Sequence, residues 1–368
     1  MRESLSGPAM NLLSLYNKLE SLVNRLPEAL QRPILQEITP IKTLFLLQHP
    51  PRLVLLGARG PGKAAVVNAL FGAEVMRESE EDFSDGGWQT FTQLGRGALQ
   101  VLDARRPASP ATVQTSLVTH APDLYLFLHS AEEADGVTPE SLTHAAEILQ
   151  FADHRHAARP KLLGLVTPRA DDAVTDSARN LLHTALRASG PIADRLLGTI
   201  TLADPERLAE RIAVELPGEA QLEMARLSGN RELQKQIAQV VIKSATAICA
   251  AIGAQPIPFA DFPILTSIQA SLVGSIMHIS GREMSPKLAG EFMGALGANI
   301  GAGLVLREGA RAAARLVPIW GSAVSSAVAA GGTYAIGRAA SAYFIEGVSL
   351  PDARSVFRRG RRSKKLLK

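Results

Sequence analysis

Short apolar runs alternate with helix-compatible segments between about residue 50 and residue 205 of the chain. The runs are 53–56 (LVLL), 98–103 (ALQVLD), 124–129 (LYLFLH), 161–167 (KLLGLVT) and 198–202 (GTITL). Segments 63–71, 139–151 and 171–188 separate most of them and favour helix. Strands that recur with helical crossovers predict an α/β domain whose mostly parallel sheet carries helices on both faces. The turn at residues 95–97 (GRG) predicts a hairpin, and hence one antiparallel strand.

The segments on either side of this region predict helices only. Residues 10–46 have an apolar stripe at spacings of three and four, and Pro33 and Pro40 are expected to break it into short helices. After residue 215 the strand signals end, and the chain becomes rich in Ala, Gly, Ser, Ile and Leu. We therefore expect a helical extension, an α/β domain, an all-α domain and a basic tail, at residues 1–50, 51–210, 216–347 and 348–368.

Two stretches of the expected all-α domain carry no formal charge. Residues 262–280 and 316–337 are 19 and 22 residues long, which is enough for a helix to cross a bilayer. Both are bounded or interrupted by prolines. Small residues such as Gly331, Gly332 and Gly337 would let helices approach closely. A membrane-spanning, a membrane-associated and a soluble helical bundle all stay open.

Basic charge is concentrated at the C-terminal end of the chain. The residues from Ala353 on include eight lysines and arginines and no acid, so a net charge of +4 for the whole chain leaves −4 for the rest. Such a tail can bind an anionic membrane surface or RNA phosphates, or it can be a solvated terminus. Aromatic residues make up only 5%, which argues against a base-stacking surface. The single cysteine, Cys249, excludes a disulfide framework and a cysteine-ligated zinc or iron–sulfur site.

The sharpest local feature is the segment from Gly57 to Ala64 (GARGPGKA), which matches G-x-x-x-x-G-K but lacks the usual final Ser or Thr. Gly57, Gly60 and Gly62 would let the backbone curl so that its N–H groups point at phosphate oxygens. Lys63 would reach the β- and γ-phosphates, and the helix that follows offers its positive end. The alternative to a phosphate-binding loop is an ordinary strand–turn–helix with a surface lysine.

Residues 53–72 (LVLLGARGPGKAAVVNALFG) resemble the opening of the Era-like P-loop GTPases. By this resemblance, Asp103 stands where the family has the Asp of D-x-x-G, which usually holds Mg²⁺ through water. Segment 168–171 (PRAD) stands where the family has [NT]-K-x-D, so Asp171 would accept from the guanine base and Arg169 would replace the lysine beside it. The resemblance implies nucleotide-binding roles for the loop residues through Ala64, with GTP or GDP and Mg²⁺ as ligands.

Several family positions carry residues that weaken catalysis. Ala64 replaces the hydroxyl that ligates Mg²⁺, Arg106 replaces the Gly of D-x-x-G, and Pro168 replaces the Asn or Thr of the base motif. The switch threonine has two loose candidates, Thr90 and Thr92. Phosphoryl transfer depends on positioning and on Mg²⁺, so hydrolysis should suffer more than binding, and we expect at most a weak GTPase. We interpret Arg105 and Arg106 as solvated loop arginines rather than as an arginine finger.

The expected all-α domain has a resemblance of its own. Segments 255–266 (QPIPFADFPILT) and 280–283 (SGRE), followed by a glycine- and alanine-rich end, look like the YcjF-like helical domain of unknown function. In bacteria that domain often follows a GTPase domain and is often predicted to be membrane-associated. The resemblance implies no biochemical activity for this part of the chain.

These observations lead to one main hypothesis and two alternatives. The main hypothesis is a cytoplasmic guanine-nucleotide-binding protein with weak or lost GTP hydrolysis, placed peripherally at the inner face of the cell membrane if its tail binds anionic lipid. One alternative, which Ala64 and Arg106 favour, is a pseudo-GTPase that acts as an interaction scaffold and binds no nucleotide. The other, less favoured, is an RNA- or ribosome-associated protein that uses the basic tail. The sequence identifies no protein partner.

Overall fold

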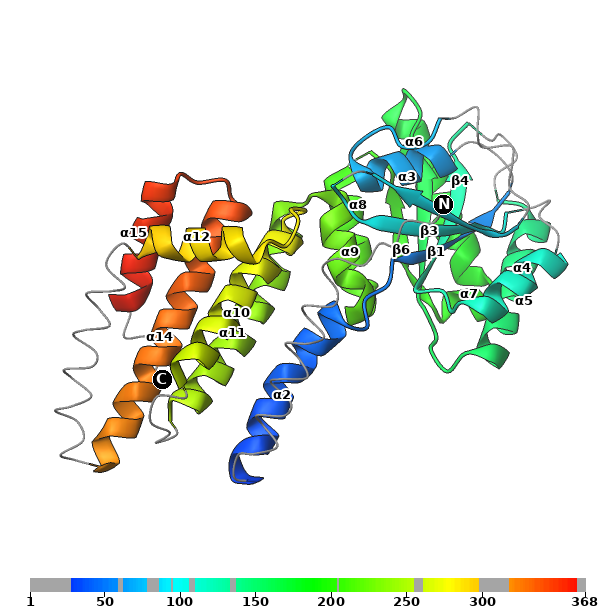
Figure 1. The fold of residues 1–368 in the computed structure, drawn as a ribbon. Helices are drawn as coiled ribbons and strands as arrows, with labels where there is room; N and C mark the ends of the chain where they lie inside the picture. The colour runs from blue at the N-terminus through cyan, green and yellow to red at the C-terminus, as the bar shows by residue number, and fades with distance from the viewer. Residues whose placement is uncertain are drawn as a thin grey trace, which may run out of the picture. The chain divides into compact units, whose positions relative to one another are not determined.

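The computed structural model describes residues 28–58, 62–77, 86–93, 95–105, 110–132, 137–203, 205–254, 261–297 and 318–362. Contacts divide the chain into two compact units. Residues 49–230 form an α/β unit, and the residues before and after it together form a helical unit. Figure 1 shows the sheet of the first unit and the long helices of the second.

The α/β unit is built on a six-stranded sheet with the strand order β2-β3-β1-β4-β5-β6. The strands are β1 (Arg52–Gly57), β2 (Trp88–Thr92), β3 (Ala98–Asp103), β4 (Leu124–Ser130), β5 (Leu162–Thr167) and β6 (Leu196–Thr201). β2 pairs with β3 in antiparallel fashion, and the other strand pairs are parallel. The predicted mostly parallel sheet and its hairpin are thereby confirmed.

Helices cover both faces of this sheet. They are α3 (Lys63–Phe71), α4 (Pro110–Thr119), α5 (Pro139–Arg155), α6 (Asp172–Ala188), α7 (Gly190–Ala193), α8 (Pro205–Glu215) and α9 (Gly218–Ser228). Residues of α4 to α7 share one hydrophobic core with Val54 and Leu56 of β1. Leu53 and Leu55 alternate with these two and are also fully buried, on the face that α3, α8 and α9 cover. Burial of consecutive strand residues is typical of parallel sheets between two helical layers.

α9 belongs to the α/β unit, although the sequence predicts an all-α domain from residue 216. The carboxylate of Glu223 is largely buried and accepts a hydrogen bond from the backbone N–H of Ala98, at the start of β3, over 3.2 Å. The same carboxylate pairs with Arg226 at 2.8 Å. The first of these contacts binds α9 to the start of β3.

The turn of the β2–β3 hairpin is bound to two helices. Arg96 donates hydrogen bonds to the carbonyl oxygens of Phe71 and Leu227, at the C-terminal ends of α3 and α9. A cation is favourable there because the C-terminal carbonyl groups of a helix carry partial negative charge. The boundary of the unit therefore falls after Asn230, some twenty residues beyond the predicted residue 210.

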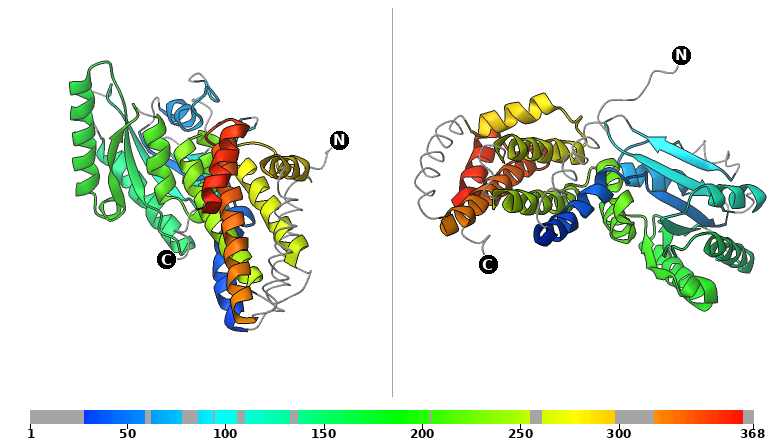
Figure 2. Two further views of the ribbon diagram at one scale, coloured as in Figure 1. Left: turned by 90° about the vertical axis from the view of Figure 1, so that its left-hand side faces the viewer. Right: turned by 60° about the horizontal axis from the view of Figure 1, so that its bottom comes forward.

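The helical unit consists of helices from both ends of the chain. They are α2 (Glu28–Phe45), α10 (Arg231–Gly253), α11 (Asp261–Ile279), α12 (Pro286–Leu296), α14 (Pro318–Phe344) and α15 (Leu350–Arg362). α10 packs against α2, α11 and α14, and α14 also packs against α11 and α15 (Figures 1 and 2). In sequence, the α/β unit is thus inserted between the first two described helices of this unit.

The N-terminal segment differs from its prediction in two ways. α2 is one continuous helix that includes Pro33 and Pro40. It also packs on α10 as part of the helical unit rather than forming a separate extension. Ile38, Leu44 and Phe45 are buried. Burial of an apolar face stabilises a helix more than its intrinsic propensity does, and this packing offsets the hydrogen bonds that the prolines remove.

α10 and α14 approach closely at one glycine. A β-carbon on Gly337 would lie 2.7 Å from the Cγ1 atom of Ile242 in α10, which is closer than side chains pack. Gly331 and Gly332 would meet nothing within 4 Å. The predicted close contact is therefore confirmed for Gly337 alone among these three.

Among the described residues, α10 is the one helix that is long and apolar enough to cross a membrane, and half of that stretch is buried inside the protein. The core helix of a soluble protein meets the same criterion. The uncharged stretch 262–280 corresponds to α11, whose apolar part, Leu265–Ile279, is shorter. The stretch 316–337 lies partly outside the described residues. Membrane association stays a prediction.

The first part of the predicted basic tail is a docked helix. Ala353 and Phe357 of α15 are buried. The Nε atom of Arg354 donates a hydrogen bond of 2.7 Å to the carbonyl oxygen of Ala295, near the end of α12. One of the eight basic side chains of the predicted tail, that of Arg354, therefore forms a hydrogen bond within the helical unit.

Other cations of this segment face the solvent. The side chains of Arg358 and Arg359 are exposed on α15. The predicted boundary at residue 348 therefore does not separate a tail from the helical unit, because α15 packs on α12 and α14. Residues 363–368 lie outside the described part of the chain.

Candidate functional site

The candidate site lies at the carboxyl edge of the sheet, where β1, β3 and β4 end side by side. Gly57 at the end of β1 pairs with Leu128 of β4, and Leu55 pairs with Asp103 at the end of β3. After β1 the chain turns toward β3 on one side, and after β4 it turns toward β5 on the other. In open α/β sheets, ligands bind at such a switch point. The loop after β1 therefore stands where a ligand is expected.

Two glycines of this loop are required by the backbone. Gly57 has a φ of 118°, and a β-carbon on it would lie 2.3 Å from the carbonyl oxygen of Leu128. Gly62 precedes α3 with a φ of 130°, and its β-carbon would lie 3.0 Å from the Cγ2 atom of Thr167 in β5. Residues with side chains rarely adopt such φ values. The third predicted glycine, Gly60, lies outside the described residues.

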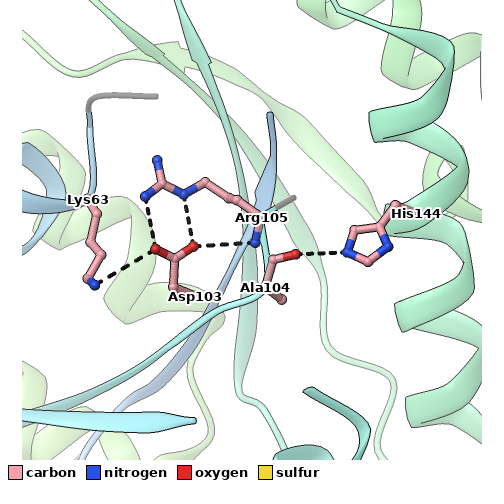
Figure 3. Close-up of polar contacts among 5 residues, drawn as sticks. All are labelled: Lys63, Asp103, Ala104, Arg105 and His144. Atoms are coloured by element: carbon pink, nitrogen blue, oxygen red, sulfur yellow. Dashed lines mark hydrogen bonds and ion pairs between the residues drawn. The ribbon is translucent and has the colours of Figure 1, made fainter. Parts of the chain in front are cut away.

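Lys63 is the first residue of α3 and is only 1% exposed. Its Nζ atom lies 3.8 Å from the Oδ2 atom of Asp103 (Figure 3). The surface lysine that the sequence allowed as an alternative is therefore wrong. Ala64 follows in the helix and is equally buried. The structure thus brings together the loop lysine and the carboxylate that the sequence predicts to hold Mg²⁺.

Arg105 also lies at this site, although the sequence predicts a solvated side chain. Its Nε and Nη2 atoms each donate a hydrogen bond of 2.9 Å to a different oxygen of Asp103, and its backbone N lies 3.3 Å from Oδ1 (Figure 3). The arginine is 6% exposed, so its interpretation as a solvated loop residue is wrong. Arg106 lies outside the described residues. The only signal in the sequence was an arginine two positions after an aspartate that ends a strand.

The turn that carries Arg105 is held by a helix of the same unit. The Nε2 atom of His144 in α5 lies 3.0 Å from the carbonyl oxygen of Ala104, between the aspartate and the arginine (Figure 3). As a donor, this imidazole fixes the peptide that sets the direction of Arg105. The arginine–aspartate contact is thus supported by a residue forty positions away in sequence.

These residues do not fit a magnesium ion. Mg²⁺ prefers oxygen ligands in near-octahedral geometry, and Ala64 has no hydroxyl to offer. Both oxygens of Asp103 accept hydrogen bonds from Arg105, and one of them also faces Lys63. Within the described ranges, no group of three or more His, Cys, Asp or Glu side chains is arranged to hold a metal ion. The carboxylate is therefore engaged by two cationic side chains rather than presented to a metal.

The residues predicted to read the base follow β5. Asp171 is the N-cap of α6, and its Oδ1 atom accepts a hydrogen bond of 2.9 Å from Ala173 N. The buried hydroxyl of Thr175 accepts from Arg169 N at 3.0 Å, which ties this segment to the first turn of the helix. The side chains of Asp171 and Arg169 are exposed. Since Gly62 lies beside Thr167 at the end of β5, this segment adjoins the phosphate loop.

The two candidates for a switch threonine lie within β2 and not in a loop. Thr90 pairs with Gln100, and Thr92 pairs with Ala98. Gln100 precedes Asp103 by three residues, which corresponds to about 10 Å along a strand. Neither threonine therefore reaches the candidate site.

The strand order, the antiparallel β2 and the glycine–lysine loop after β1 define the α/β unit as a P-loop-like α/β fold. Neither a family model nor a curated protein matches the chain. A solved structure that matches is the crystal structure of a dimerization-deficient mutant of Toc33 from Arabidopsis thaliana. That match has 17% sequence identity and a TM-score of 0.31, and it covers 49% of this chain and 82% of that chain. The fold class follows from this chain's own strands and helices.

Proposed function

We propose that the protein binds guanine nucleotides and hydrolyses GTP weakly or not at all. The observation that carries the proposal is the position of Lys63, buried at the N-terminus of α3 behind a loop that requires glycine at Gly57 and Gly62. Backbone N–H groups and the helix dipole favour phosphate at such a terminus. The loop also adjoins the switch point of the sheet.

Preference for guanine rests on Asp171. A carboxylate can accept hydrogen bonds from both N1–H and the 2-amino group of guanine, and adenine has neither donor. Asp171 is exposed in the segment that adjoins the phosphate loop. Only its Oδ1 atom caps α6, so its second oxygen is not needed for the cap.

Weak or absent hydrolysis is expected because the positions that would ligate a metal ion carry unsuitable or engaged side chains. Phosphoryl transfer by P-loop proteins relies on Mg²⁺ to neutralise the developing charge. Ala64 supplies no ligand, and both oxygens of Asp103 are hydrogen-bonded to Arg105. Binding needs only the loop amides and the lysine, and it is therefore less affected than catalysis.

Titration of the native protein with labelled GDP, GTP and ATP tests this function. We expect GDP and GTP to bind and ATP to bind more weakly. Lys63→Ala should abolish binding, whereas Lys161→Ala, an exposed lysine before β5, should leave the affinity unchanged. Circular dichroism of each variant shows whether the fold is retained. Absence of binding by the native protein at millimolar nucleotide would contradict the proposal.

The arginine–aspartate contact also favours the second candidate function, an interaction scaffold that binds no nucleotide. Lys63, Asp103 and Arg105 satisfy part of one another's charge without any ligand. A site closed by such internal ion pairs could keep the fold and lose its ligand. The same titration separates the two functions.

For the helical unit, we propose a peripheral position at an anionic membrane surface on the cytoplasmic side. The support is the exposed pair Arg358 and Arg359 on α15, which are followed in sequence by further lysines and arginines. Each basic residue near such a surface contributes about 1 kcal/mol.

A further inference from the structure

We infer that Arg105 takes the place of a divalent cation at this site, so that the nucleotide phosphates are bound without a metal ion. The inference rests on the proposed nucleotide binding and specifies the chemistry of that site. It starts from the disagreement between the side chains around Asp103 and the requirements of Mg²⁺.

The two cationic side chains are close enough to hold one phosphate group. Lys63 Nζ and Arg105 Nη2 both contact the Oδ2 atom of Asp103, at 3.8 and 2.9 Å. The two nitrogens are therefore no more than 6.7 Å apart, the sum of those distances. Charge-assisted hydrogen bonds of about 2.8 Å to neighbouring oxygens of one phosphate span such a separation. A phosphate bound by Lys63 is thus within reach of Arg105.

The charge of the cluster suits an anion. Lys63, Asp103 and Arg105 together carry +1, and all three are buried. A guanidinium stays protonated at every physiological pH, and its planar fork matches phosphate and carboxylate geometry. Positive charge is therefore permanently present at the end of β3. A metal-binding site would instead gain its positive charge only when it binds an ion from solution.

Asp103 acts as a positioning residue in this arrangement. Its two oxygens accept hydrogen bonds from the Nε–H group and from one N–H of Nη2 of Arg105. These are two of the five donors of the guanidinium. The contact fixes the plane of the guanidinium beside Lys63, and His144 holds the intervening peptide. A metal ion could reach the carboxylate only by breaking two charge-assisted hydrogen bonds, which are stronger than neutral ones.

The first experiment uses the native protein. Binding of labelled GDP and GTP is titrated in excess EDTA and again in excess Mg²⁺, with inorganic pyrophosphate as a competitor that lacks the base. We expect the two dissociation constants for each nucleotide to agree within about twofold, and pyrophosphate to compete in EDTA. A loss of affinity of about tenfold or more in EDTA would overturn the inference, even though nucleotide binding itself would stand.

Variants of Arg105 assign the effect to this residue. In EDTA, Arg105→Ala should weaken GDP binding by at least about tenfold, and Mg²⁺ should restore part of it because the carboxylate of Asp103 becomes available. Arg105→Lys, which keeps the charge but loses the fork, should fall between Arg105→Ala and the native protein. Arg187→Ala, an exposed arginine at the end of α6, is the matched control and should bind like the native protein.

Each of the remaining outcomes also supports or overturns the inference. Native affinity of Arg105→Ala in EDTA would overturn the inference. If Arg105→Ala fails to fold by circular dichroism, the comparison in the native protein and in Arg105→Lys still decides it. Absence of nucleotide binding by the native protein in both EDTA and Mg²⁺ would overturn the proposed function together with this inference, and that result differs from binding that requires Mg²⁺.

Discussion

Asp123 lies at the amino edge of the sheet, opposite the candidate site, in surroundings that favour its protonated form. Burial raises the pKa of Asp123 to about 6. The hydrogen bond from Arg52 N and the charge of the nearby His49 ring lower this pKa, but by less than burial raises it. The charge of Arg52 also lowers this pKa, and that of Glu219 raises it. In an unfolded chain the pKa of an aspartate is about 3.9. The native carboxyl therefore holds a proton over a pH range in which the unfolded one does not.

We predict that this group makes the α/β unit less stable as pH rises from about 4 to about 6, and that its contribution is constant above that window. The sign follows because the native state binds more protons than the unfolded state within the window. The change in the free energy of unfolding should be on the order of 3 kcal/mol. Urea denaturation at a series of pH values measures it.

Two variants test the assignment to Asp123. Asp123→Asn should remove this part of the pH dependence, and Asp194→Asn, whose side chain is exposed, should retain it. An unchanged pH dependence in Asp123→Asn would show that another group is responsible.

At the scale of single residues, the sequence predicts the place of a residue best where that residue adjoins the end of a strand. Gly57, Lys63 and Asp103 all follow or end apolar runs, so their meeting at one edge of the sheet could be predicted. Arg105 could not be placed, because an arginine in a loop is ordinarily solvated. Its burial depends on the protein around the turn, including the contact of His144 with Ala104.

At the scale of elements, α15 combines packing and charge on one helix. Phe357 and Ala353 are buried, while Arg358 and Arg359 are exposed. Removing the helix would therefore disturb the helical unit as well as its charge. Charge reversal of the exposed pair is the cleaner test of a membrane role.

We predict that Arg358→Glu combined with Arg359→Glu weakens binding to liposomes with anionic lipid. Each basic residue near the surface is worth about 1 kcal/mol, so reversal of two should lower the partition coefficient at least about tenfold. Liposome sedimentation at low and high salt measures the effect. The matched double variant Arg159→Glu with Arg187→Glu, in the α/β unit, should bind like the native protein.

Two results would count against the membrane role of α15. One is equal liposome binding by the native protein and the α15 variant. The other is binding of the native protein to RNA but not to anionic liposomes, with loss of RNA binding in the α15 variant.

At the scale of the whole molecule, the contiguous α/β unit interrupts a helical unit made from both ends of the chain. The predicted domain limits, residues 51–210, end inside α8 and omit α9. α3 packs on both of these helices, and Glu223 of α9 binds the start of β3. Both helices are therefore part of the α/β core.

We predict that a fragment of residues 49–230 folds by itself, whereas a fragment of residues 51–210 is markedly less stable. The shorter fragment leaves one face of the sheet without α9 and cuts α8, so its melting temperature should be lower by at least about 5 °C. Thermal unfolding followed by circular dichroism compares the two. Equal melting temperatures would mean that α9 adds nothing to the stability of this unit.

The sequence by itself determined the class of the α/β unit. Apolar runs, helical crossovers and turn glycines are local patterns, and the run order was enough to predict a mostly parallel sheet with one hairpin. The same local information located Gly57, Gly62 and Lys63 in a loop between strand and helix. These features depend on residues within a few positions of one another, so they can be recognised without knowledge of the packing.

Only the tertiary structure decided which helices and strands pack against one another. Periodicity shows that a helix has an apolar face, but it does not show what that face meets. α2 stays helical through its two prolines because α10 packs on it. α9 contacts the sheet through Glu223 and Ala98, which are 125 residues apart in sequence. α15 docks on α12 through Arg354 and Ala295, which are 59 residues apart. The surroundings of Asp103 depend likewise on the burial of Arg105. In an exposed loop, water would solvate the guanidinium and leave the carboxylate to a metal, whereas in this fold burial makes their mutual contact the favourable one.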